Sequence, residues 1–146
     1  MANHQLALND YVSFFENMKT DDLVHLDRFF TSDAHFKDPF NEVHGIDKIT
    51  HIFEHMFNTL GNPNFHVDEA LLTGDVAYIK WQFNAQLKKK SITLIGISRV
   101  VFNQQGLASE HIDYWDASEQ FYMKLPFIGG LLRFIQRQVS AIKATN

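Results

Sequence analysis

The chain has 146 residues, of which 45% are hydrophobic and 21% are charged, a composition typical of one globular domain. Its net charge is -4, whereas proteins that bind nucleic acid usually carry an excess of basic residues. Nucleic acid is therefore not expected as a partner. It contains no cysteine, which excludes disulfides, thiolate nucleophiles and cysteine-ligated metals. The sequence shows neither a secretory signal nor an apolar run of membrane-spanning length, and therefore predicts a cytoplasmic protein.

The N-terminal part of the chain is predicted to be mainly helical, because its apolar residues recur at helical spacing. The predicted helices cover 6–18, 19–30 and 45–60. Thr20 is the expected N-cap of the second helix, since a threonine oxygen can accept a hydrogen bond from the first helical turn. Between the second and third helices, Pro39 favours an extended backbone at Asp38.

The remainder of the predicted domain consists of strands followed by a helical extension. The predicted strands cover 64–72, 75–87, 91–103 and 107–117, and turn-forming residues separate them. Short turns between long strands predict an antiparallel meander, and therefore an α+β fold with its helices on one face of the sheet. Residues 118–143 are helical in pattern, divided by Pro126 and Gly129-Gly130. We expect one domain over 1–146, with a core over 1–117 and an extension over 118–146.

The segments FKDPF (36–40) and DYWD (113–116), in this order of elements, resemble the nuclear-transport-factor-2-like superfamily. The likeness is greatest to small SnoaL-like proteins, in which an LP…G…R helix follows the DYWD strand. The resemblance covers the whole chain and implies a cone, in which three N-terminal helices pack on a strongly curved antiparallel sheet and leave an apolar pocket. It also implies a homodimer through the convex face of the sheet, and acid–base chemistry without a metal or an organic cofactor.

Ketosteroid isomerases, which belong to this superfamily, place a catalytic Asp directly before a Pro after the second helix. Asp38 matches that position, so the resemblance implies that it is a general base. In those enzymes a Tyr and a protonated Asp hold the enolate. Here Phe14 aligns with the Tyr, Tyr11 lies one turn earlier, and Ser98 aligns with the Asp. Because these strong donors are missing, steroid isomerisation is not predicted.

Limonene-epoxide hydrolases use an Asp–Arg–Asp trio together with a Tyr and an Asn. Asp113 fits one acid of the trio, whereas Lys80 and Gln82 stand in place of the Arg and the second Asp. Phe36 and Asp38 replace the Tyr and the Asn. Since only one of these roles is retained, epoxide hydrolysis is not predicted either.

The orientation of the strand 75–87 has two interpretations. The alignment places Lys80 and Gln82 in the pocket, where an ion pair between Lys80 and Asp113 would make the burial of both charges tolerable. Ordinary patterning instead buries Ile79 and Trp81 and directs Lys80 and Gln82 to solvent. We adopt the first interpretation here. His111 and Trp115 share the strand face of Asp113 and are therefore predicted to line the pocket as well.

Three further signals have alternative explanations. HIFEH (51–55) matches a zinc motif, but it falls on the polar side of its predicted helix without a third ligand, so no metal site is predicted. Asp38 could cap the chain reversal that follows it instead of acting in a pocket. The segment 126–143 predicts an amphipathic basic helix that packs on the domain or a partner, or covers the pocket; binding to a membrane surface is the alternative.

These observations predict a SnoaL-like protein whose pocket binds a compact apolar molecule with a carbonyl or hydroxyl group. Asp38 would be the general base of an isomerase, cyclase or hydrolase, and Asp113 a second acid. The predicted substrate-binding residues are Phe14, Phe36, Lys80, Gln82, Ser98, His111 and Trp115. The alternative is a non-catalytic ligand-binding or protein-interaction module with a vestigial pocket.

Overall fold

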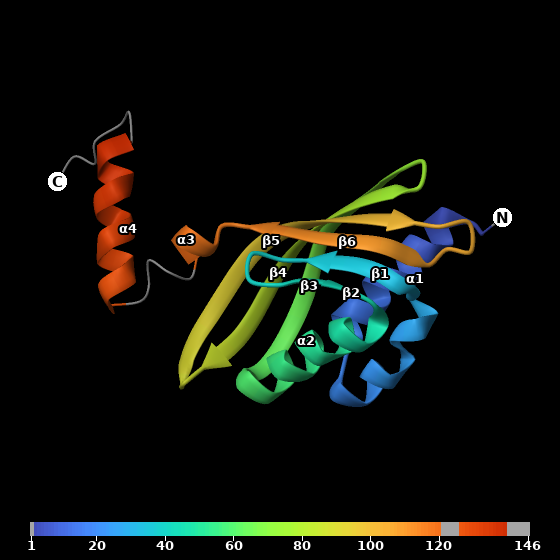
Figure 1. The fold of residues 1–146 in the computed structure, drawn as a ribbon, viewed down its shortest axis with the longest axis horizontal. Coiled ribbons are helices and arrows are strands. Elements are labelled where there is room, and N and C mark those ends of the chain that lie inside the picture. Colours follow the sequence, from blue (N-terminus) through green and yellow to red (C-terminus); the bar gives the residue numbers. More distant parts are fainter. Residues whose placement is uncertain (1, 121–125, 140–146) are drawn as a thin grey trace. The chain divides into compact units, whose positions relative to one another are not determined.

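The computed structural model describes residues 2–120 and 126–139 (Figure 1). Residues up to Trp115 form one compact unit, whereas α3 (Ala117–Gln120) and α4 (Pro126–Val139) belong to a second. In the described ranges, no helix is both long and apolar enough to cross a membrane.

The first unit combines helices with one curved sheet. Its elements are α1 (His4–Asn17), the 3-10 helix η1 (Thr20–Arg28), β1 (Phe30–Lys37), β2 (Glu42–His44), α2 (Ile46–Thr59), β3 (Gly61–Thr73), β4 (Val76–Leu87), β5 (Lys90–Phe102) and β6 (Ala108–Trp115). The strand order is β2-β1-β6-β5-β4-β3. Only the pair formed by β1 and β6 is parallel among the described strands. The predicted α+β layout and its antiparallel meander are confirmed.

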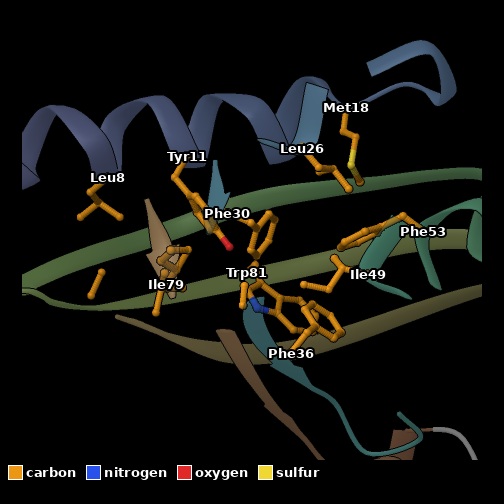
Figure 2. Packing of buried hydrophobic residues seen from close by; sticks show 14 of the residues in the cluster. Leu8, Tyr11, Met18, Leu26, Phe30, Phe36, Ile49, Phe53, Ile79 and Trp81 are labelled. Carbon is orange, nitrogen blue, oxygen red and sulfur yellow. The ribbon is translucent and has the colours of Figure 1, made fainter. Parts of the chain in front are cut away.

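Asn3 is the N-cap of helix α1, and its side-chain oxygen accepts hydrogen bonds from the backbone N–H groups of Gln5 (2.9 Å) and Leu6 (3.3 Å). This satisfies two donors that the start of a helix leaves free. Leu8 and Tyr11, three residues apart on one side of α1, are both buried. Figure 2 shows these two side chains pointing from α1 toward the strands. The N-terminal helix is thereby fixed against the sheet.

The second predicted helix differs from expectation in type and in its cap. It is the 3-10 helix η1, and Thr20 is its first residue and not its N-cap. The carboxylate of Asp22 accepts a hydrogen bond from the backbone N–H of Lys19 (2.8 Å) and so closes the first turn. Strand β2 was not predicted, because three residues are too few to show an alternating pattern.

The third predicted helix, α2, is confirmed. Gly45 precedes it with φ +100°, a conformation that favours glycine. Ile49 and Phe53, one turn apart, are buried in the same core as Leu8 and Tyr11 (Figure 2). Pro126 begins α4 as predicted, but Gly129 and Gly130 lie inside that helix and do not interrupt it. The parts of the predicted C-terminal helix at 121–125 and 140–143 lie outside the described residues.

The sheet has a buried inner face, against the helices, and an outer face. Along β4 the side chains of Ile79, Trp81, Phe83 and Ala85 are buried, whereas the alternating Tyr78 and Lys80 are exposed. The alternation follows from the two-residue period of a strand. The inner face therefore carries the core, and every side chain of β4 is assigned to one face or the other.

Candidate functional site

A small cavity lies inside the first unit, between α1, α2 and the inner face of the sheet. It is lined by Tyr11, Val12, Phe15, Phe53, Phe65, Val67, Ile79, Trp81, Ser98, His111 and Asp113. Its volume is about 30 Å³, which exceeds the roughly 10–15 Å³ that one water molecule needs. Figure 2 shows Tyr11 reaching from α1 toward the strand that carries Ile79 and Trp81. Most of the lining is apolar, and its polar groups belong to Tyr11, Trp81, Ser98, His111 and Asp113.

These polar groups form one hydrogen-bonded chain that runs across four elements. The Tyr11 hydroxyl contacts His111 Nδ1 (2.6 Å), and His111 Nε2 contacts Asp113 Oδ1 (2.7 Å). The same oxygen accepts a hydrogen bond from Ser98 Oγ (2.5 Å), which in turn accepts one from Trp81 Nε1 (2.8 Å). We call these five side chains the buried network.

Strand register brings the buried network together. Ser98 of β5 lies directly opposite Asp113 of β6, which places their side chains on the same face. His111 precedes Asp113 by two residues and shares that face. Trp81 of β4 lies opposite Gly96, two residues before Ser98. The network therefore depends on three adjacent strands holding one register.

Gly96 is required for the position of Trp81. A Cβ atom at this position would lie 2.5 Å from Cζ2 and 2.6 Å from Cη2 of the Trp81 indole. Because glycine has no side chain, the indole lies flat over β5 and its N–H reaches Ser98. The glycine thus positions the donor at one end of the network.

The donors and acceptors define the direction of each bond. The indole N–H of Trp81 can only donate, so Ser98 accepts that bond and donates its own proton to Asp113. With Asp113 as a carboxylate, His111 donates from Nε2 and accepts from Tyr11 at Nδ1. Every donor of the network then has an acceptor. In the part of the chain that the structure describes, Asp113 Oδ2 makes no hydrogen bond, although Asp113 lines the cavity.

Tyr11 is held as a donor by its surroundings. Its side chain is 1% exposed, and the rings of Phe15, Phe30 and Phe102 lie around it at centroid distances of 4.9, 5.7 and 5.6 Å. Burial raises the pKa of the Tyr11 hydroxyl well above its usual value, and the negative charge of Asp113 raises it further. Tyr11 therefore stays protonated, and its hydroxyl donates a hydrogen bond to His111 Nδ1.

His111 is fixed from a second direction by Phe36. The two rings stack with a centroid distance of 5.0 Å and an interplanar angle of 18°. His111 is 5% exposed and Phe36 is 2% exposed. The stacking restrains the plane of the imidazole, so both of its nitrogen atoms stay aligned with their partners.

Asp38 lies in the turn after β1 and not in the lining of the cavity. Its Oδ1 accepts hydrogen bonds from the backbone N–H groups of Phe40 and Asn41, both at 2.7 Å. Burial raises the pKa of Asp38, these hydrogen bonds lower it, and the charge of Asp113 adds a smaller upward effect. The contacts support the turn-capping interpretation of Asp38.

The expected positions of Lys80 and Gln82 are wrong. Both belong to the outer face of β4, where Lys80 is exposed and Gln82 donates a hydrogen bond to Asn84 (3.2 Å). Their neighbour Trp81 occupies the inner face, and strand parity therefore excludes them from the cavity. Asp113 is stabilised by Ser98 and His111, not by an ion pair with Lys80.

The other predicted residues divide into two groups. Ser98, His111 and Asp113 line the cavity as expected, and Phe36 lies behind His111. Phe14 and Trp115 are not part of the lining. The ring of Phe14 stacks on Phe29 at 4.1 Å, and that of Trp115 contacts Phe40 at 5.3 Å.

Two residues of the network, Tyr11 and Trp81, were not among the predicted site residues. Tyr11 was noted one turn before Phe14, and the choice between them depended on which side of the helix faces inward. The spacing of Tyr11 from buried Leu8 is the signal that could have selected it. For Trp81, the apolar alternation of β4 indicates its face, although not its hydrogen bond to Ser98.

The candidate ligands of the zinc-like motif HIFEH are exposed, and His35 is half-buried. His51, Glu54 and His55 are exposed on α2. His35 contacts Glu42 on the outer face, with 3.0 Å between His35 Nε2 and Glu42 Oε1. Across residues 2–120 and 126–139, no cluster of three or more histidine and acidic side chains could hold a metal ion.

Comparison with known proteins identifies the fold. The sequence profile of the SnoaL-like domain matches residues 11–111. A nuclear-transport-factor-2-like protein of unknown function from Burkholderia pseudomallei is 18% identical over 82% of this chain and 95% of its own, with a TM-score of 0.69. An epoxide hydrolase from Mycobacterium tuberculosis that resembles limonene-epoxide hydrolases is 15% identical over 92% and 96%, with a TM-score of 0.68.

A third solved structure, a candidate SnoaL-like polyketide cyclase from Shewanella putrefaciens, is 16% identical over 85% of this chain and 99% of its own, with a TM-score of 0.67. No curated protein sequence matches the chain. At these identities the neighbours establish the fold, and the predicted nuclear-transport-factor-2-like fold is confirmed.

The substitution Tyr11→Phe tests the donor role of Tyr11. At pH 7 it should lower the free energy of unfolding by about 1–3 kcal/mol, because His111 Nδ1 loses its partner in a buried site. Above about pH 10, tyrosine ionises in the unfolded chain whereas Tyr11 keeps its proton in the fold. Wild-type stability should therefore fall with rising pH, by up to about 1.4 kcal/mol per pH unit from this residue alone.

The difference between wild type and Tyr11→Phe should consequently narrow between pH 9.5 and 11 in urea unfolding titrations, about the usual tyrosine pKa. Phe53→Leu is the matched control, because it alters the same core without removing an ionisable group, and its difference from wild type should stay constant over this pH range. A difference between wild type and Tyr11→Phe that stays constant across this range would contradict the assignment.

Proposed function

Because the chain belongs to the SnoaL-like domain family, we propose that it binds a compact, largely apolar small molecule beside Asp113 and exchanges a proton with it. The main support for this proposal is the difference between the two oxygen atoms of the Asp113 carboxylate. One oxygen, Oδ1, accepts two hydrogen bonds from the buried network, whereas Oδ2 accepts none among the described residues and the side chain is 16% exposed. A ligand with a carbonyl or hydroxyl group would present an acidic C–H or an O–H to that oxygen.

The surroundings of Asp113 suit acid–base work. Ser98 and His111 fix the orientation of the carboxylate, so a bound ligand meets a preorganised base. The largely apolar lining would strengthen electrostatic interactions at Asp113, whose side chain is 16% exposed. A positioned general base of this kind contributes a rate factor of roughly 10²–10⁴.

The buried network offers few donors to a developing oxyanion. Tyr11, Trp81 and Ser98 each donate to another member of the network. This favours a proton transfer that needs modest charge stabilisation, or binding without turnover, over steroid isomerisation. The sequence points the same way, because Phe14 and Ser98 stand where ketosteroid isomerases have their two oxyanion donors.

Ligand binding must enlarge the cavity. Its volume of about 30 Å³ is far below the roughly 300–1,000 Å³ of typical small-molecule sites. Phe65 and Val67 are half-buried lining residues on β3, which is an edge strand of the sheet. An edge strand pairs with a neighbouring strand on one side only, so we propose that these two residues move when a ligand enters.

The test is a ligand screen followed by two matched substitutions. Thermal shifts against compact ketones, phenols, lactones and epoxides should yield related hits, since a ligand at about 100 times its Kd adds roughly 2.7 kcal/mol of apparent stability. Asp113→Asn should lower turnover of a reactive hit by roughly 10²–10⁴, and Asn can still accept the hydrogen bonds from Ser98 and His111.

Asp38→Asn is the control for this substitution. It removes a nearby carboxylate but keeps an oxygen for the Phe40 and Asn41 amides, so turnover should stay within about twofold of wild type. Loss of turnover in Asp38→Asn with full activity in Asp113→Asn would overturn the proposal and favour Asp38 as the general base. Absence of any hit from folded protein would favour the interaction module.

A second candidate function rests on the outer face of the sheet. Tyr78, Ile95, Ile97 and Tyr114 project from β4, β5 and β6 and are 43–58% exposed. Ile97 lies opposite Tyr114 in the register, and the ion pair of Arg99 with Glu110 (2.7 Å) borders this apolar group. Exposed apolar groups of this kind mark interaction sites. We propose that a second copy of the chain covers it.

The dimer proposal predicts a dimer in sedimentation velocity at micromolar concentration. Ile97→Glu should yield monomers with unchanged far-UV circular dichroism, because a charge would be buried without a partner at the interface. Lys88→Glu, in the turn after β4, is the control and should remain dimeric. A monomeric wild-type protein, or a dimer that persists in Ile97→Glu, would contradict this interface.

A further inference from the structure

Helix α4 presents an apolar side and basic side chains. Leu131, Phe134 and Ile135 are 61%, 54% and 48% exposed, and their spacing of three and four residues places them on one side of the helix. Arg133 and Arg137 are one turn apart, and Arg137 follows Phe134 by three residues. Arg137 therefore lies at the border of the apolar side, and Arg133 lies further from it.

Charge is strongly segregated along the chain. Residues 121–146 contain four basic residues, Lys124, Arg133, Arg137 and Lys143, and no acidic residue. Residues 1–115 contain nine basic and fifteen acidic residues, a net charge of -6. An anionic surface would therefore repel residues 1–115 and attract residues 121–146.

These two features match the requirements of a lipid interface. A helix that lies in the headgroup region needs bulky apolar side chains on one side and cationic groups that reach the phosphates. Leu131, Phe134 and Ile135 supply the first, and Arg133 and Arg137 supply the second, because a long arginine side chain can extend toward the headgroups. The 14 residues of α4 are fewer than the roughly 20 needed to span a bilayer, so the helix would lie along the surface.

We propose that α4 binds the surface of an anionic phospholipid membrane. Its apolar side enters the boundary between headgroups and acyl chains, and its arginines pair with lipid phosphates. This inference is independent of the chemistry proposed for Asp113, because α4 belongs to the second compact unit and Asp113 to the first. Packing of α4 on its own domain or on a second copy is the competing outcome.

The experiment is co-sedimentation of the full-length protein with vesicles of phosphatidylcholine alone or with one quarter phosphatidylglycerol. We expect binding to the anionic vesicles at low salt, which weakens as sodium chloride rises from about 0.1 M to 0.5 M because the charges are screened. Arg133→Gln with Arg137→Gln should weaken partitioning about 30-fold, from about a factor of five for each charge. Leu131→Ser with Phe134→Ser should reduce it at least as much with every charge retained.

Lys88→Gln with Lys89→Gln is the matched control. It removes the same two positive charges from the turn between β4 and β5, both exposed, and should leave partitioning within about twofold of wild type. Equal loss in this control would overturn the proposal, since binding would then reflect overall charge. Failure of wild-type protein to bind anionic vesicles, or a change of sedimentation coefficient in the α4 variants without vesicle binding, would also overturn it and assign α4 to a protein contact.

Discussion

The pair of hydrogen bonds to Asp113 Oδ1 is the interaction on which the interior of this protein depends. A carboxylate in an apolar cavity is costly unless its charge is compensated by donors. Ser98 and His111 supply those donors, and each is itself held, Ser98 by Trp81 and His111 by Tyr11. The acid of the cavity is therefore part of the framework that joins α1 to three strands.

The same contacts explain why core and site cannot be separated. Tyr11 and Trp81 are buried in the core, and each also donates a hydrogen bond within the network. A substitution at either residue should therefore affect both the stability of the fold and the orientation of Asp113. Gly96 has a similar double role, because its missing side chain admits the indole. Such a framework leaves little empty space, which accounts for a cavity of about 30 Å³. On the proposal above, a ligand would displace Phe65 and Val67 of the edge strand β3, both of which line this cavity.

Sequence reasoning predicted the fold and three of the five residues of the buried network. The elements follow from hydrophobic periodicity, and His111 shares a face with Asp113 because the period of a strand is two. Lys80 and Gln82 were assigned wrongly, since an alignment to distant enzymes was preferred over the apolar alternation of their own strand. The link from Trp81 to Ser98 could not be predicted, because it depends on cross-strand register at Gly96. Asp38 had two explanations in sequence, and its backbone contacts favour the turn cap.

The position of the His111 proton determines whether the buried network runs from Tyr11 through His111 to Asp113. These two hydrogen bonds require a neutral imidazole with its proton on Nε2, because Nδ1 accepts from Tyr11 and Nε2 donates to Asp113. Nitrogen-15 NMR of the folded protein at pH 7 would report this tautomer, and a His111→Gln variant would assign its signals among those of the eight histidines. A neutral ring protonated at Nε2 is the predicted result. A proton on Nδ1, or a doubly protonated ring, would contradict the direction of the network and with it the availability of Asp113 as a base.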